Sequence, residues 1–276
     1  KSIIMNYLGS TFGGGAIAAL ALATKLTEPL ERSAFWGLRM MMFSHTARLF
    51  VERNERAVAE LYKKGIKASF LLLAPLLWWV GLNGDEIVRV LFQRGRFTVE
   101  MAGLVAGALV ALIPSVLFIG MNQLLSNGFY AMNRVKVPAT VMPFGTAVYV
   151  GAAVPLGALL GTQGLALATT VTAVLTFVAL FACFARVLPD LRPLRTALKM
   201  LFYALLAGAT MIAATGLLRS LGGPPFVVAA LSLPLGAAFH AGVLAASGDE
   251  TFRMLFRFAQ GFLRPGGART AATPRQ

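Results

Sequence analysis

The sequence is poor in charge, in histidine and in cysteine, and each shortage excludes a class of protein. Charged residues make up only 13% of the 276 residues, about half the share found in soluble globular domains. The single cysteine, Cys183, and the two histidines, His45 and His240, all lie in apolar stretches. Neither a disulfide framework nor a Cys/His metal site is therefore expected. We interpret all three as packing or interfacial residues.

Sequence motifs of enzymes and nucleotide-binding proteins are also missing. No Ser/His/Asp set, paired carboxylates, metal-ligand spacing or GxxxxGK loop can be found. We therefore predict a protein that is not an enzyme, with no catalytic residue, cofactor or metal. The net charge of +14 could suggest nucleic acid, but the cations cluster between apolar runs, where they set membrane topology instead. No nucleic-acid partner is expected.

Long apolar runs dominate what is present. The chain is 57% hydrophobic and has a mean hydropathy of +0.73. Because a bilayer core of about 30 Å needs about 20 apolar residues per helix, the runs predict an all-α, polytopic membrane helix bundle. Eight transmembrane helices are expected at about residues 2–24, 33–50, 66–82, 99–125, 138–160, 164–185, 197–218 and 225–246.

Lys and Arg predict the orientation of this bundle. Most of them fall in segments 48–67, 134–136 and 186–199 and in the tail from residue 247. The positive-inside rule places these segments, and both ends of the chain, in the cytoplasm. Segment 48–67 is expected to be an amphipathic helix with the pairs Glu52/Arg56 and Glu60/Lys64. Residues 248–276 are expected to form a basic amphipathic helix that rests on anionic membrane lipids, followed by a disordered cytoplasmic tail.

The stretch Arg89–Thr98, "RVLFQRGRFT", is cationic although it is predicted to lie on the outer side. We expect a short interfacial helix through Phe92, ended at Gly95, and a helix cap at Thr98. Our interpretation is an interfacial corner that binds lipid headgroups through its cations; the alternative is a direct role in moving a substrate. The cations are Arg89, Arg94 and Arg96.

Four motifs in this chain resemble those of one family. They are "ALATKLTEPL" (21–30), "VLFQRGRFT" (90–98), "NGFYAMNRVKVPATV" (127–141) and "LGTQGLALATTV" (160–171). Together they are similar to the MurJ/MviN lipid II flippases of the multidrug/oligosaccharidyl-lipid/polysaccharide exporter superfamily. The resemblance implies the second lobe of a fourteen-helix, two-lobed protein: a six-helix lobe at 1–187, two additional helices at 188–247 and the tail at 248–276. The N-terminal lobe would precede the present chain.

That resemblance also implies a function. The protein would sit in the bacterial plasma (inner) membrane and flip an undecaprenyl-pyrophosphate-linked glycan from the inner to the outer leaflet by alternating access. The alternatives are an exporter of exopolysaccharide repeats or other amphiphiles, and a non-transporting flippase-like scaffold for envelope-building enzymes. The chain departs from the family at Lys25, where arginine is usual, and at Tyr149 and Ala153, where some members carry sodium ligands. A sodium site is not expected.

Two cations are the candidate substrate-binding residues. Arg39 lies inside a predicted span, and Lys25 lies at the end of the preceding one. Because an intramembrane charge is costly, we predict that both face a wet cavity between the lobes and meet the substrate pyrophosphate. The alternatives are snorkelling of Arg39 to the interface and an ordinary helix-end charge for Lys25.

Overall fold

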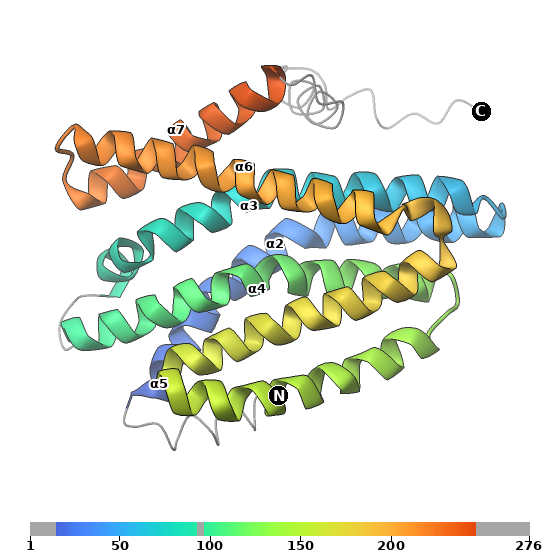
Figure 1. Ribbon diagram of the computed structural model, residues 1–276, viewed down its shortest axis with the longest axis horizontal. Helices are drawn as coiled ribbons and strands as arrows, with labels where there is room; N and C mark the ends of the chain where they lie inside the picture. Colours follow the sequence, from blue (N-terminus) through green and yellow to red (C-terminus); the bar gives the residue numbers. More distant parts are fainter. Residues whose placement is uncertain (1–14, 93–96, 247–276) are drawn as a thin grey trace.

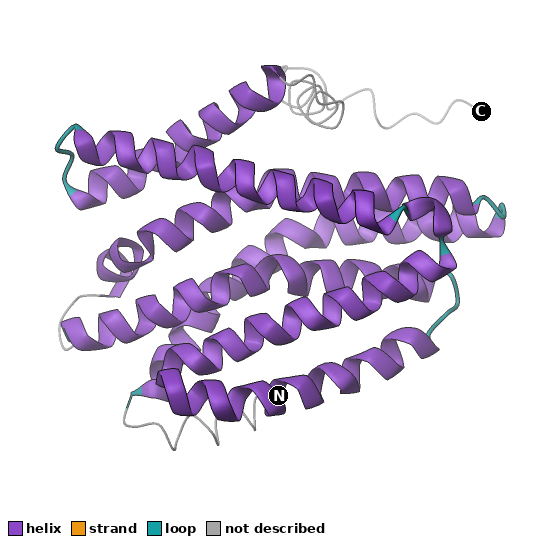
Figure 2. Ribbon diagram, viewed as in Figure 1, coloured by secondary structure: helices purple, strands orange, loops and turns teal. Residues whose placement is uncertain are grey.

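The computed structural model describes residues 15–92 and 97–246, and within these residues it contains helices and no strand (Figures 1 and 2). The helices α3, α4, α5, α6 with the preceding 3-10 turn, and α7 are long and apolar enough to cross a membrane. The predicted all-α membrane bundle is confirmed, whereas the described residues leave the number of eight crossings undecided. The elements are α2 (Ala16–Val51), α3 (Glu55–Phe92), α4 (Val99–Ala131), α5 (Lys136–Val187), the 3-10 helix η1 (Pro189–Leu191), α6 (Pro193–Ser220) and α7 (Pro225–Ala246).

Helix α2 departs from the sequence prediction. The predicted spans at 2–24 and 33–50 imply a break between them, but α2 runs unbroken for 36 residues, about 54 Å at 1.5 Å per residue. The polar stretch consists largely of good helix formers, and Pro29 is accommodated within the helix. The charged residues of this stretch therefore belong to the middle of a long helix. Most of the first predicted span, residues 1–14, lies outside the described residues.

The predicted separate helix at 48–67 is wrong. Helix α2 ends at Val51, the chain turns at Arg53 in the left-handed region (φ 54°), and residues from Glu55 onward already belong to α3. The turn separates Glu52 from Arg56, so Glu52 lies near Arg48 instead, at 3.6 Å. Glu60 likewise contacts Lys63, at 2.7 Å, rather than Lys64.

Helix α3 kinks at Asn83 (φ −119°, ψ 17°) before its last turns. In Figure 1 those turns are seen almost end-on, so they run across the main direction of the bundle. The kink thus sets a short helix through Phe92 apart from the rest of α3, as predicted, while its position at a membrane interface stays a prediction. Thr98 caps α4 as predicted, because its side chain accepts a hydrogen bond from the Met101 backbone N–H at 3.2 Å. Gly95 lies outside the described residues.

Helix α5 contains two of the predicted spans. It reverses direction at Gly161, whose φ of 55° and ψ of −128° favour glycine, and its two halves run side by side in opposite directions (Figure 1). The halves touch closely, because a Cβ on Gly164 would overlap the Leu156 carbonyl and one on Gly145 would meet Thr176. The predicted break between residues 160 and 164 is confirmed.

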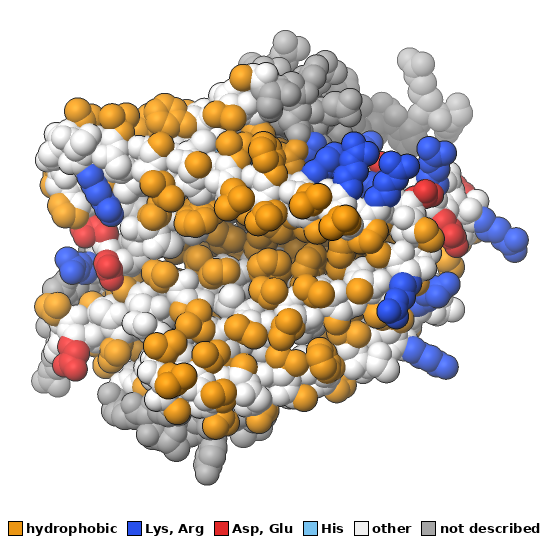
Figure 3. Space-filling view, in the orientation of Figure 1, with side chains coloured by type: hydrophobic (Ala, Val, Ile, Leu, Met, Phe, Trp, Pro, Cys, Tyr) orange, Lys and Arg blue, Asp and Glu red, His pale blue; other side chains and the backbone are white. Residues whose placement is uncertain are grey.

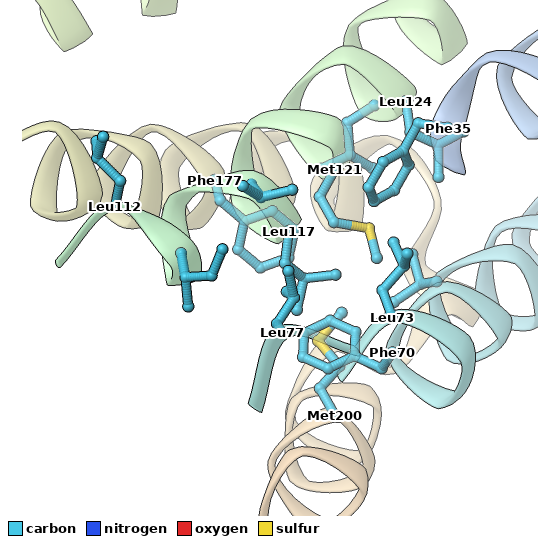
Figure 4. Packing of buried hydrophobic residues seen from close by; sticks show 14 of the residues in the cluster. Phe35, Phe70, Leu73, Leu77, Leu112, Leu117, Met121, Leu124, Phe177 and Met200 are labelled. Atoms are coloured by element: carbon cyan, nitrogen blue, oxygen red, sulfur yellow. The ribbon is translucent and has the colours of Figure 1, made fainter. Parts of the chain in front are cut away.

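The core is built mainly from side chains of α2 to α6. Phe35 of α2, Phe70 and Leu77 of α3, Met121 of α4 and Phe177 of α5 belong to one buried cluster, shown in Figure 4. Helix α2 packs mainly along α4, and α4 also packs along α5. One face of α2 is therefore fixed to the bundle while its opposite face stays exposed.

The α6–α7 pair packs on α3. Trp78 Nε1 donates a hydrogen bond to the Ala204 carbonyl of α6 at 2.9 Å, and Trp79 Nε1 donates one to the Ala229 carbonyl of α7 at 2.7 Å. The pair has few contacts with α5. The division into a six-helix lobe and two additional helices stays a prediction, and segment 248–276 lies outside the described residues.

Charge is distributed unevenly along the bundle. Figure 3 shows a broad apolar middle, with Lys and Arg gathered at the end that contains the α2–α3 turn, the α4–α5 turn and the start of α6. We call this the basic end. Its cations outside the α3–α6 contact are Arg48, Arg53, Arg134, Lys136 and Arg186. The opposite end carries charges of both signs: Asp85, Glu86, Arg89, Glu100 and Arg219.

Candidate functional site

A stripe of charged and aromatic residues runs along the exposed face of α2. Lys25, Glu28, Arg32, Trp36 and Arg39 follow one another at intervals of three or four residues, so they share one side of the helix. All are exposed except Arg39, which is half-buried. We call these five residues the α2 stripe. Helix α2 is not among the helices apolar enough to cross a membrane, because its middle carries these charges.

An open cavity of about 700 Å³ lies against the stripe, and we call it the α2 cavity. Six of its lining residues come from α2, and Gln123 comes from α4. Its walls combine two cations, two carboxylates, an amide, a hydroxyl and an indole, so the cavity is polar although the surrounding bundle is apolar. The residues from α2 are Glu28, Glu31, Arg32, Ser33, Trp36 and Arg39.

Hydrogen bonds and ion pairs make the two cations of the cavity unequal. Arg32 Nη2 lies 3.7 Å from Glu28 Oε2, and both side chains are more than half exposed, so this contact is weak. Gln123 Nε2 donates a hydrogen bond to Glu31 Oε1. Arg39 forms no ion pair with any carboxylate among the described residues. Of the two cations of the cavity, only Arg32 therefore has a carboxylate at ion-pair distance among the described residues.

The two predicted substrate-binding residues occupy different places. Arg39 lines the α2 cavity. Lys25 is exposed on the same stripe, two turns before Arg32, and is not among the lining residues. Of the three interfacial arginines, Arg89 is exposed on α3 beyond the kink, while Arg94 and Arg96 lie outside the described residues.

The positions where some family members bind sodium do not fit a cation. Tyr149 and Ala153 are fully buried. Together their side chains offer one hydroxyl and no carboxylate, whereas a hard cation needs several oxygen ligands. Within residues 15–92 and 97–246, no group of three His, Cys, Asp or Glu side chains could hold a metal ion.

Of the seven residues that line the cavity, only Arg39 is a candidate from the sequence; Glu31 and Gln123 show why the others were missed. Glu31 sits at helical spacing beside the stripe, but it falls between the predicted spans 2–24 and 33–50, so the sequence pattern does not place it on a helix face. Gln123 lies 92 residues further along the chain, and only the packing of α4 on α2 brings it there. A helical wheel drawn through residues 25–39 would have found Glu31, but no local pattern identifies Gln123.

Comparisons with known proteins agree on one family. Residues 1–235 match the family described as "Lipid II flippase MurJ". Two curated proteins named "Probable lipid II flippase MurJ" are similar to the chain. The one from Bdellovibrio bacteriovorus is 28% identical over 223 residues, covering 77% of this chain and 40% of that protein. The one from Rhizobium tropici is 28% identical over 176 residues, covering 62% and 32%.

A solved structure gives the same fold. It is named "Lipid II flippase MurJ, inward closed conformation" and matches with a TM-score of 0.72 at 15% identity, covering 89% of this chain and 50% of that chain. At this identity the likeness establishes the fold alone. The chain spans 40% or less of the two curated relatives and half of the solved chain.

Proposed function

Because the chain belongs to the MurJ family of lipid II flippases, we propose that it forms one lobe of a transporter for an undecaprenyl-pyrophosphate-linked glycan. The cargo is of the lipid II kind and moves from the inner to the outer leaflet of the bacterial plasma membrane. The observation that carries this proposal is the α2 cavity, a polar hollow on an apolar bundle in which Arg39 has no carboxylate partner among the described residues.

Energetics support a wet cavity at this place. A charge inside the bilayer costs about 3 kcal/mol on insertion scales, and α2 carries Glu28, Glu31, Arg32 and Arg39 in its middle. A helix with these residues against lipid tails would be unstable. The same helix facing water and an anionic headgroup avoids that cost.

The residues of the cavity have distinct parts in substrate binding. The pyrophosphate carries concentrated negative charge, and an arginine can bind phosphate oxygens through two parallel N–H groups. Arg39 offers this fork at the cavity wall. Gln123 engages the carboxylate of Glu31, which disfavours pairing of Glu31 with Arg39. Arg32 exchanges its weak contact with Glu28 for the headgroup, and Lys25 attracts the anion from the outer part of the same stripe.

Transport by such a lobe requires no bond-making residue. The exposed face of α2 lines one side of the hollow, and the partner lobe implied by the family closes the other side. Rocking of the two lobes opens the hollow to one leaflet and then to the other, while the lipid tail stays in the bilayer. The basic end faces the cytoplasm by the positive-inside rule, so an inside-negative potential favours export of the anion, by about 2.3 kcal/mol per charge at 100 mV.

Replacing Arg39 tests this function. In cells depleted of their own lipid II flippase, the full-length protein is expected to restore growth and outer-leaflet lipid II. The variant Arg39→Ala is expected to lose about ten- to hundredfold in transport rate, since a hydrogen bond to a charged group contributes about 1.5–3 kcal/mol. Arg39→Lys should keep part of the activity.

The control is Arg134→Ala, an exposed cation of the basic end that lies outside the α2 cavity. Its transport should stay within about twofold of the wild type, as for a surface substitution. Equal activity of Arg39→Ala and wild type would contradict substrate binding in the cavity. Failure of the wild type to flip lipid II while it exports another polyprenyl-linked glycan would reassign the cargo.

A further inference from the structure

A second hollow, separate from the α2 cavity, lies at the basic end where the first turns of α3 meet the start of α6. Its volume is about 390 Å³. Helix α3 contributes Arg56, Lys63, Lys64 and Lys67, and the start of α6 contributes Arg192, Arg195 and Lys199. Only two carboxylates, Glu60 and Asp190, lie among the lining residues. We call this hollow the α3–α6 cleft.

The charge of the α3–α6 cleft is largely uncompensated. Glu60 contacts Lys63 at 2.7 Å, and Lys67 Nζ lies 5.4 Å from the centre of the Tyr203 ring. The remaining cations form no ion pair with any residue in the described part of the chain. Like charges gathered around one hollow repel each other, so an anion that binds between them would stabilise the arrangement. The remaining cations are Arg56, Lys64, Arg192, Arg195 and Lys199.

The cleft also has large apolar lining residues, and it lies where two membrane helices begin. Ile66, Met200 and Tyr203 line it and are all buried. The spans predicted from sequence in α3 and α6 start at residues 66 and 197, so the hollow lies at the level of the membrane surface. Lysine and arginine stems can lie along apolar surface there while their charged groups stay in the headgroup layer. Helix α6 also begins here, and the partial positive charge of its N-terminus adds to the field.

We propose that the α3–α6 cleft binds the headgroup of an anionic phospholipid from the surrounding leaflet. Its phosphate lies between Arg195 and Lys199 of α6 and Lys64 of α3, and its acyl chains leave along the apolar surface of the bundle. Basic pockets between membrane helices are a recurrent way to bind such headgroups. The bound lipid neutralises the repulsion between α3 and α6 and so fastens the α6–α7 pair to the bundle. This inference does not depend on the cargo.

A soluble phosphate could satisfy the same cations. The position of the cleft favours the lipid, because it lies where two membrane helices begin and the surrounding leaflet supplies anionic headgroups at that level. The experiment therefore compares phosphatidylglycerol with inorganic pyrophosphate, which offers phosphate charge without acyl chains, and with zwitterionic phosphatidylcholine.

The test uses the full-length protein purified in detergent and two matched double variants. Arg195→Ala/Lys199→Ala removes two cations of the cleft. Arg134→Ala/Lys136→Ala removes two exposed cations of the basic end outside the cleft. Native mass spectrometry measures retained phosphatidylglycerol, and thermal unfolding measures the rise in melting temperature on adding each probe. Wild type and the second variant are expected to retain the lipid and to be stabilised by it, whereas the first variant should bind it at least tenfold more weakly.

Thermal unfolding without lipid checks that the cleft variant folds. Because the substitution relieves repulsion, Arg195→Ala/Lys199→Ala should then melt at or above the wild-type temperature. A lower temperature would mean that the cations stabilise the fold by themselves, which overturns the proposal. Equal lipid binding by the two double variants would mean that lipid binding depends only on diffuse surface charge, and this would overturn the proposal too. If pyrophosphate raised the melting temperature of the wild type as much as phosphatidylglycerol does, the ligand would be a soluble anion, and the proposal would again be wrong.

Discussion

Gln123 on α4 donates a hydrogen bond from Nε2 to Oε1 of Glu31 on α2, across 2.5 Å, and so joins the two helices at the wall of the α2 cavity. The donor is neutral and the acceptor is a carboxylate, which makes this a charge-assisted bond. It engages the acidic group that competes most directly with an anionic substrate for Arg39. The interaction therefore contributes both to helix packing and to the electrostatics of the cavity.

Removing the donor should weaken both contributions. We expect Gln123→Ala to lower the free energy of unfolding by about 1.5–3 kcal/mol, the usual contribution of a hydrogen bond to a charged group, measured by chemical unfolding in detergent. The released Glu31 carboxylate should then pair with Arg39 and slow transport. Ser33→Ala is the control, because this cavity hydroxyl bonds only to backbone carbonyls of its own helix. Equal stability of Gln123→Ala and Ser33→Ala would contradict the role of the bond.

For Lys25 we predict a substitution that keeps or raises the transport rate instead of lowering it. It lies on the α2 stripe but outside the lining of the cavity, and lysine lacks the two-pronged geometry with which arginine binds phosphate. Lys25→Arg should therefore keep or raise the transport rate, and Lys25→Ala should lower it less than Arg39→Ala does. Side-by-side measurement of outer-leaflet lipid II in depleted cells decides this. A loss for Lys25→Ala as large as that for Arg39→Ala would place Lys25 at the substrate.

Much of the fold could be predicted from the sequence. The lengths of the apolar runs correctly predict membrane-spanning segments in α3, α4, both halves of α5, α6 and α7. Thr98 correctly predicts the start of α4. The four motifs led to the family that the comparisons establish. These successes share a cause: each feature is local, since a bilayer sets the length of a span and a cap is decided within one turn.

The errors also share a cause. Residues 25–32 fall outside the predicted spans because they are polar, yet they are helical in α2, where Glu28, Glu31 and Arg32 line a cavity and need not be apolar. Arg39 stood out because an isolated charge in an apolar run is costly. Glu31 and Gln123 were missed because their meeting depends on how α2 packs on α4, which no short stretch of sequence encodes. The spacing of three or four residues between Lys25, Glu28, Arg32, Trp36 and Arg39 indicates a helix even though the mean hydropathy of this stretch is low.

The contact between α2 and α4 can be tested through two glycines. A Cβ on Gly120 of α4 would overlap the ring of Phe35, which is fully buried, whereas a Cβ on Gly37 of α2 would meet nothing within 4 Å. Gly120→Ala should destabilise the protein by about 1–3 kcal/mol through overpacking. Gly37→Ala should stabilise it by up to about 1 kcal/mol, because glycine is unfavourable inside a helix. Chemical unfolding of both variants measures this, and a shift of the same sign in both would contradict the packing.

Docking of the α6–α7 pair on α3 should depend on the indole of Trp79. Its Nε1 donates to the Ala229 carbonyl of α7 at 2.7 Å, and phenylalanine keeps most of the apolar contact while it removes the donor. Trp79→Phe should lower the free energy of unfolding by about 1 kcal/mol, the net contribution of a neutral hydrogen bond. The matched control is Trp36→Phe, since Trp36 is 62% exposed on α2 and should change stability little. Unfolding of both variants in detergent compares them. If the exposed indole proved as costly to replace as the bonded one, the loss would come from ring contacts in general, and the bond to α7 would not hold the pair in place.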